Sequence, residues 1–146
     1  MRLNTSASVI SFAKQLEADS AVFYEKMAEK YPEAAALSHT FAKENNNYTT
    51  MIQRAYYGVI TDAIEGCFAF SVETDKYTFE REPAEEPGYA DALNQAIDME
   101  QTLISFYTDA AEQSEAFMAD VPRTFLIVAK KRKSREDKLR TLLKER

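Results

Sequence analysis

Apolar side chains recur every three or four residues along most of the chain, which is the spacing of one buried face of an α-helix. The first stripe follows Thr5 and Ser6, two residues that commonly cap helices, and predicts a helix over about residues 6–30. Tyr31 and Pro32 end this helix, because proline favours extended backbone at the residue before it. The stripe contains Val9, Ala13, Leu16, Ser20, Tyr24 and Met27.

A second stripe predicts a helix over about residues 33–64, opened by Pro32 and Glu33 and followed by Gly66. So few residues separate the two helices that we expect a hairpin with a very short turn. The stripe contains Leu37, Phe41, Tyr48, Ile52, Ala55 and Val59.

The second half of the chain repeats this arrangement. Helical spacing predicts a third helix over about residues 89–117 and a fourth over about 121–145, the latter opened by Asp120 and Pro122. The third stripe contains Leu93, Ile97, Glu100, Ile104, Tyr107 and Ala111, and the fourth contains Phe125, Val128, Arg132, Arg135, Leu139 and Leu142. Residues 66–88 break the helical spacing, so we expect a long connection with some extended structure that packs across the bundle or against a second subunit.

Two hairpins joined by a connection of about 23 residues predict an all-α fold. The expected architecture is a four-helix up-down bundle of ferritin-like topology, with the long crossover between helices 2 and 3 and one domain over residues 1–146. An internal repeat supports it, because residues 16–29 align without gaps to residues 99–112. Residues 41–52 align more weakly to residues 128–139, so the chain has the pattern of a duplicated helix pair.

Charge is unevenly distributed along the chain. Residues 130–146 carry nine Lys or Arg and a net charge of +6, which leaves −12 for residues 1–129. A basic segment can bind nucleic acid, but the acidic remainder opposes this, so we expect no nucleic-acid partner. No apolar run reaches 18 residues and no signal peptide is recognisable, so we expect no membrane span and a cytoplasmic location.

The chain has one cysteine and one histidine, which excludes an internal disulfide framework and the usual Cys/His zinc cages. We expect Cys67 to act as a small apolar residue and His39 to lie at the surface or at a helix cap. The sequence contains no glycine-rich phosphate loop and no pattern of a nucleophile elbow or a catalytic triad. No catalytic residue is therefore predicted.

Six polar residues lie on the predicted inward stripes, where each needs a partner or a function. They are Glu17, Asn45, Tyr48, Glu100, Arg132 and Arg135. Three-residue spacing places Asn45 and Tyr48 on one helix face, and Arg132 and Arg135 on another.

The segments LEADSAVFYEKMAE and MEQTLISFYTDAAE resemble the first and third helices of rubrerythrins and related ferritin-like proteins. In that family, a glutamate six residues before an aromatic pair ligates iron, and Glu17 and Glu100 match it. The resemblance implies a dimer and an iron or manganese oxidoreductase or peroxidase. The family's other two helices each carry a Glu-x-x-His pair, whereas this chain has Asn45 and Tyr48 on one helix and arginines on the other.

The arginines, Arg132 and Arg135, cannot deprotonate to become ligands, so we expect no bound metal; an ion, if held, would sit on Glu17 and Glu100. Two carboxylates and two guanidiniums balance in charge and match in bidentate geometry, which predicts an internal ion-pair cluster. Asn45 and Tyr48 are expected to satisfy its leftover groups. Tyr24 and Tyr107 are expected to be core residues with hydrogen-bonded hydroxyls.

Two alternatives concern the same positions. The arginines could leave a pocket for a small anion, a carboxylate or a phosphate. Glu44 and Glu136, each one residue from a missing ligand position, could turn inward if their helices were rotated by about 100°.

Two hypotheses of function follow. The first is a non-catalytic rubrerythrin-like bundle, without cofactor, that acts by binding or assembly as a homo-oligomer, with a dimer implied by the resemblance. The second is a di-iron or di-manganese rubrerythrin-like oxidoreductase or peroxidase with atypical ligands.

Overall fold

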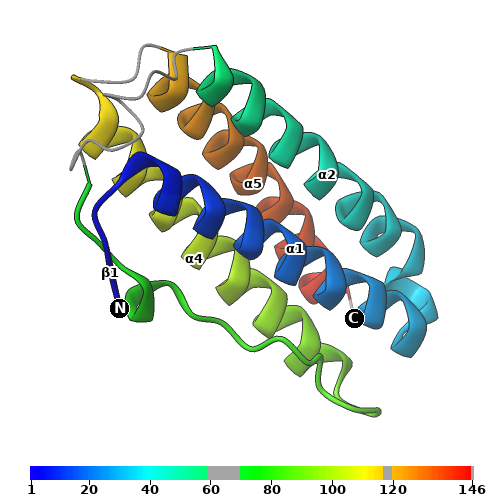
Figure 1. Ribbon diagram of the computed structural model, residues 1–146. Coiled ribbons are helices and arrows are strands. Elements are labelled where there is room, and N and C mark those ends of the chain that lie inside the picture. The colour runs from blue at the N-terminus through cyan, green and yellow to red at the C-terminus, as the bar shows by residue number, and fades with distance from the viewer. Residues whose placement is uncertain (59–69, 117–119, 146) are drawn as a thin grey trace.

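The computed structural model describes residues 1–58, 70–116 and 120–145. Within these ranges, four long helices form a bundle: α1 (Ser6–Lys30), α2 (Ala35–Tyr57), α4 (Tyr89–Ser114) and α5 (Asp120–Glu145) (Figure 1). The predicted all-α four-helix bundle is confirmed. Helices α1 and α2 form one hairpin, α4 and α5 form the other, and α2 also packs on α5. In the described part of the chain, no helix combines the length and apolar character needed for a bilayer span.

The helix ends follow the local sequence signals. Thr5 caps α1 by accepting a hydrogen bond from the Ser8 backbone N–H at 3.2 Å, and Tyr31 ends the helix in an extended conformation. Pro32 then opens a short 3₁₀ helix, η1 (Pro32–Ala34), before α2. The second helix was predicted to start at residue 33, but its first turn is 3₁₀. Helix α2 ends at Tyr57 and α4 ends at Ser114, so both helices stop short of the predicted ends at residues 64 and 117, which themselves lie outside the described residues.

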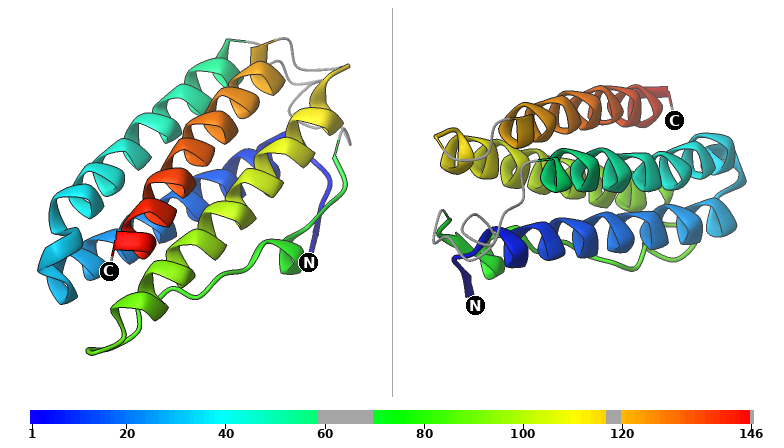
Figure 2. Two further views of the ribbon diagram at one scale, coloured as in Figure 1. Left: turned by 180° about the vertical axis from the view of Figure 1, so that it is seen from behind. Right: turned by 45° about the horizontal axis from the view of Figure 1, so that its top comes forward.

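The connection between the hairpins contains some extended structure, as predicted. Its β2 (Val72–Glu73) pairs antiparallel with β1 (Arg2–Leu3), a strand too short to leave a pattern in the sequence. After the 3₁₀ helix η2 (Thr74–Tyr77), the chain runs along the side of the bundle to the end where α4 begins (Figures 1 and 2). Helices α2 and α4 therefore run in the same direction, and α1 runs antiparallel to α4.

This connection contacts both α1 and α4. An Arg81 nitrogen lies 2.9 Å from an Asp19 carboxylate oxygen on α1. The Ala84 backbone N–H donates to the Gln95 side chain on α4 at 2.8 Å. Phe70, Val72 and Tyr77 are buried in the core of the same chain, which confirms that the connection packs across the bundle.

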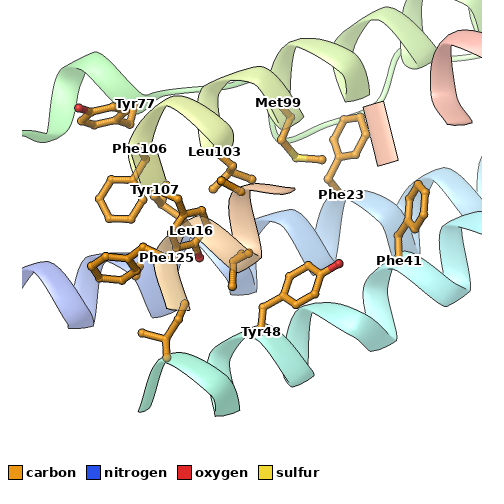
Figure 3. Packing of buried hydrophobic residues seen from close by; sticks show 14 of the residues in the cluster. Leu16, Phe23, Phe41, Tyr48, Tyr77, Met99, Leu103, Phe106, Tyr107 and Phe125 are labelled. Atoms are coloured by element: carbon orange, nitrogen blue, oxygen red, sulfur yellow. The ribbon is translucent and has the colours of Figure 1, made fainter. Parts of the chain in front are cut away.

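The core is rich in aromatic rings. Phe106 contacts the rings of Phe12, Tyr77 and Tyr107, with centroids 5.2–5.4 Å apart. Figure 3 shows Tyr107 beside Leu16 and Phe125 in the interior. The predicted stripes face this core; four of their members are only partly buried, namely Leu37, Ala55, Ile104 and Leu142, and Val59 lies outside the described residues.

Candidate functional site

The six polar residues predicted on the inward stripes are all buried at the centre of the bundle. Each is at most 4% exposed, and together they come from all four helices. We call them the central cluster: Glu17 on α1, Asn45 and Tyr48 on α2, Glu100 on α4, and Arg132 and Arg135 on α5.

Arg132 joins the two glutamates. Its Nη2 lies 2.7 Å from Glu17 Oε1, its Nη1 lies 2.6 Å from Glu100 Oε1, and its Nε lies 3.3 Å from Glu17 Oε2. All three side chains are at most 1% exposed. Burial alone would lower the pKa of Arg132, but the neighbouring Glu100 and Glu17 raise it well above its usual value. The guanidinium is therefore a permanent cation between two carboxylates.

Two tyrosines complete the coordination of these carboxylates. Tyr107 donates a hydrogen bond to Glu17 Oε2 at 2.5 Å, and Tyr24 donates to Glu100 Oε2. Burial, reinforced by the facing glutamate, raises the pKa of both tyrosines well above the usual value. Both hydroxyls therefore stay protonated donors, which confirms their prediction as core residues with hydrogen-bonded hydroxyls.

Each tyrosine contacts the glutamate of the other helix, not the one seven residues before it on its own helix. The antiparallel packing of α1 and α4 explains this crossing. The internal repeat aligns Glu17 with Glu100 and Tyr24 with Tyr107, so the two hydrogen bonds are equivalent under the repeat. The two segments of the predicted repeat thus make equivalent hydrogen bonds to each other.

Arg135 is held more loosely than Arg132. Its Nη2 donates to the Phe41 carbonyl at 2.7 Å, and its ion-pair distances to Glu44 and Glu100 are 3.5 and 3.6 Å. The guanidinium carbon lies 4.6 Å from the ring centroid of Phe41 and 4.8 Å from that of Tyr48. Within the described residues, its Nε and Nη1 have no hydrogen-bond partner. Arg135 is thus a buried cation with spare donors.

Tyr48 contacts the arginines of the central cluster, whereas the Asn45 side chain donates to a backbone carbonyl instead of a charged group. Asn45 Nδ2 donates to the backbone carbonyl of Glu17 at 3.1 Å, which ties α2 to α1. Tyr48 projects from α2 into the bundle (Figure 3) and lays its ring over both guanidiniums, 5.5 Å from the Arg132 carbon and 4.8 Å from that of Arg135. Asn45 therefore positions a helix, and Tyr48 supports the arginines through its ring face.

The two neighbouring glutamates behave differently from each other. Glu44 reaches the edge of the central cluster, 3.5 Å from Arg135, without any rotation of α2, because its long side chain extends past the helix edge. Glu136 is buried on the other side of α5, where it accepts hydrogen bonds from Gln101 at 3.3 Å and Arg140 at 2.8 Å. Those Arg140 and Gln101 hydrogen bonds lower its pKa against the opposing effect of burial.

The donor set of the central cluster does not fit a dinuclear iron or manganese centre. Arg132 and the two tyrosines already contact the carboxylates of Glu17 and Glu100. Across the described ranges, no three His, Cys, Asp or Glu side chains come together as a metal-binding group. His39 is exposed on α2, as predicted, and Cys67 lies outside the described residues.

The central cluster is chemically suited to keep oppositely charged side chains paired in the interior. Two carboxylates and two guanidiniums balance in the interior, and the protonated tyrosines stabilise the carboxylates. Comparisons with protein-family models, with curated proteins and with solved structures give no match to this chain.

Proposed function

We propose that this protein is a non-catalytic bundle of rubrerythrin-like type, in which a Glu–Arg ion-pair cluster takes the place of a metal site, and that it acts by binding or assembly. The observation that supports this most directly is the position of Arg132. Its guanidinium lies within 2.7 Å of oxygens from both Glu17 and Glu100, the only two family ligands that the resemblance carries over.

Electrostatics favours this arrangement over a bound cation. A divalent ion between the glutamates would lie beside a guanidinium that cannot lose its proton. At an effective dielectric constant of 20, two unit positive charges about 4 Å apart repel by about 4 kcal/mol, and a divalent ion doubles this. Removing the repulsion would require Arg132 to leave the core and give up its contacts with both carboxylates.

The second candidate is a di-iron or di-manganese oxidoreductase or peroxidase with atypical ligands. The facing pair Glu17 and Glu100 favours it, since one glutamate from each of two helices is half of the family's ligand arrangement. The positions of the Glu-x-x-His pairs argue against it, because they hold Asn45 and Tyr48 on α2 and arginines on α5.

Metal content separates the two candidates. We expect protein from cells supplied with iron and manganese to hold far less than one metal ion per chain, as measured by elemental (inductively coupled plasma) mass spectrometry. We also expect it to turn over no peroxide. The positive control restores both Glu-x-x-His pairs with Asn45→Glu, Tyr48→His, Arg132→Glu and Arg135→His, and should gain metal. One or two ions per unmodified chain, with peroxide turnover, would contradict the proposal.

The proposal includes a cytoplasmic location and assembly into a homodimer. An apolar groove between α4 and α5 supports assembly, because Leu126 and Ile127 stand exposed at its wall. Its α4 side carries Glu112 and its α5 side carries Lys130, so a second copy turned by a two-fold axis would meet opposite charges. Light scattering of the sample used for metal analysis reports the mass of the assembly.

A further inference from the structure

A cavity of about 390 Å³ lies between α2 and α5, beside Arg135 of the central cluster. Its size is at the lower end for pockets that take small molecules. The α2 wall is partly apolar and the α5 wall is basic. The lining residues are Phe41, Glu44, Asn47, Tyr48, Met51, Lys131, Ser134, Arg135 and Lys138.

The basic wall follows from the spacing of the sequence. Lys131, Arg135 and Lys138 are four and three residues apart on α5, so they share one helix face. Three positive charges thus border the cavity, against the single negative charge of Glu44. The excess positive charge attracts an anion and disfavours a cation.

Arg135 supplies the built part of this site. It is 2% exposed, it forms part of the cavity wall, and its Nε and Nη1 have no hydrogen-bond partner in the described residues. A guanidinium matches the paired oxygens of a carboxylate or phosphate. Phe41 and Tyr48 hold the guanidinium in place from α2, so its orientation does not depend on the ligand.

Glu44 behaves as an internal substitute for such a ligand. Its carboxylate lies 3.5 Å from Arg135 Nη2, beyond hydrogen-bonding geometry for a strong pair, and its side chain is 42% exposed. A carboxylate with this exposure can move into solvent at small cost. An incoming anion would take over the contact to Arg135 that Glu44 makes weakly.

We propose that this cavity binds a small organic dianion, a phosphate monoester or a dicarboxylate. Arg135 and the lysines Lys131 and Lys138 would hold its oxygens, and Phe41 and Met51 would contact its carbon skeleton. The inference rests on the proposed binding role of the bundle and names the class of ligand. The preference for an anion follows from three cations against one carboxylate in the lining.

Isothermal titration calorimetry of the full chain tests this site with inorganic phosphate, phenyl phosphate and succinate, each against sodium chloride at equal ionic strength. We expect saturable binding, with phenyl phosphate tighter than inorganic phosphate because the ring contacts the apolar wall. A preference for succinate over both phosphates would assign the ligand to the dicarboxylates, and the reverse order would assign it to the phosphate monoesters.

Three variants locate the binding. Lys131→Gln and Lys138→Gln should each weaken it about tenfold, because each removes a charged contact. Glu44→Gln should tighten it several-fold, because the competing carboxylate is gone. Lys130→Gln is the matched control, since it makes the same charge change on α5 but lines the groove facing α4; it should leave the affinity unchanged.

Absence of saturable binding, or an equal loss in Lys130→Gln and Lys138→Gln, would overturn the inference. Metal analysis of the same preparations keeps this result separate from the proposed function. Metal-free protein that binds none of the three anions refutes the anion site alone, whereas protein that holds iron or manganese refutes the proposed function.

Discussion

Arg132 and Arg135 lie one helical turn apart on α5 and are both buried, yet their surroundings differ. Arg132 has three nitrogens within 3.3 Å of carboxylate oxygens. Arg135 has one strong contact, to a backbone carbonyl, and ion-pair distances of 3.5 Å or more. The first side chain closes the centre of the bundle, and the second borders a cavity.

This difference separates two uses of a buried arginine. A guanidinium whose donors are matched by charged acceptors holds helices together, and removing it leaves uncompensated charge. A guanidinium held by aromatic rings at the wall of a cavity is already oriented for an external anion. We infer that Arg132 and the carboxylates it contacts maintain the fold, and that Arg135 and the cavity beside it bind an anion.

The largest effect is expected from Arg132→Leu. It would leave Glu17 without a cation and Glu100 with only the 3.6 Å ion pair to Arg135, and should cost about 3 to 5 kcal/mol in the free energy of unfolding. Urea unfolding followed by circular dichroism measures it. The control Lys133→Leu, on the same helix with an exposed side chain, should cost less than about 1 kcal/mol.

Adding Glu17→Gln and Glu100→Gln to Arg132→Leu should recover part of the lost stability, because the cost comes from stranded charge. An unchanged stability in the single variant would show that the cluster does not hold the bundle.

The second-largest effect on stability is expected at alkaline pH, through the tyrosines that donate to Glu17 and Glu100. The folded-state pKa values of Tyr24 and Tyr107 are raised above the unfolded value of about 10, so their contribution is fully present below about pH 10. It is lost as the pH rises from there toward the folded-state values, at about 1.4 kcal/mol per pH unit for each tyrosine. Urea unfolding at several pH values measures this slope.

Tyr24→Phe or Tyr107→Phe should reduce the alkaline slope, whereas Tyr57→Phe, which alters an exposed side chain, should have a smaller effect. Equal slopes in all three variants would mean that the buried hydroxyls are not responsible.

The smallest effect on stability is expected from Arg135→Met. Glu100 keeps its contacts with Arg132 and Tyr24, so no carboxylate is stranded, and the loss should be below about 2 kcal/mol. Anion binding should disappear in this variant. A stability loss as large as that of Arg132→Leu would show that the two arginines do not have different roles.

Much of the helical framework could be predicted from periodicity and caps. The first helix has the predicted ends because Thr5 offers a capping oxygen and Pro32 forces a break, and both signals are local. The β1–β2 pair could not be predicted, since two residues carry no period and their pairing joins distant parts of the chain. The position of Glu44 was also missed, because side-chain reach across a helix edge depends on the neighbouring helix.

The sequence by itself determined that six polar residues would face the interior, because helical spacing places them among apolar side chains. It also determined that the metal ligands implied by the resemblance are incomplete. Only the tertiary structure decided how these residues pair: that the tyrosines cross between α1 and α4, that Arg132 takes both carboxylates, and that Arg135 is left beside a cavity. Periodicity defines a face, whereas a pairing depends on the distances between helices, and these are set by packing.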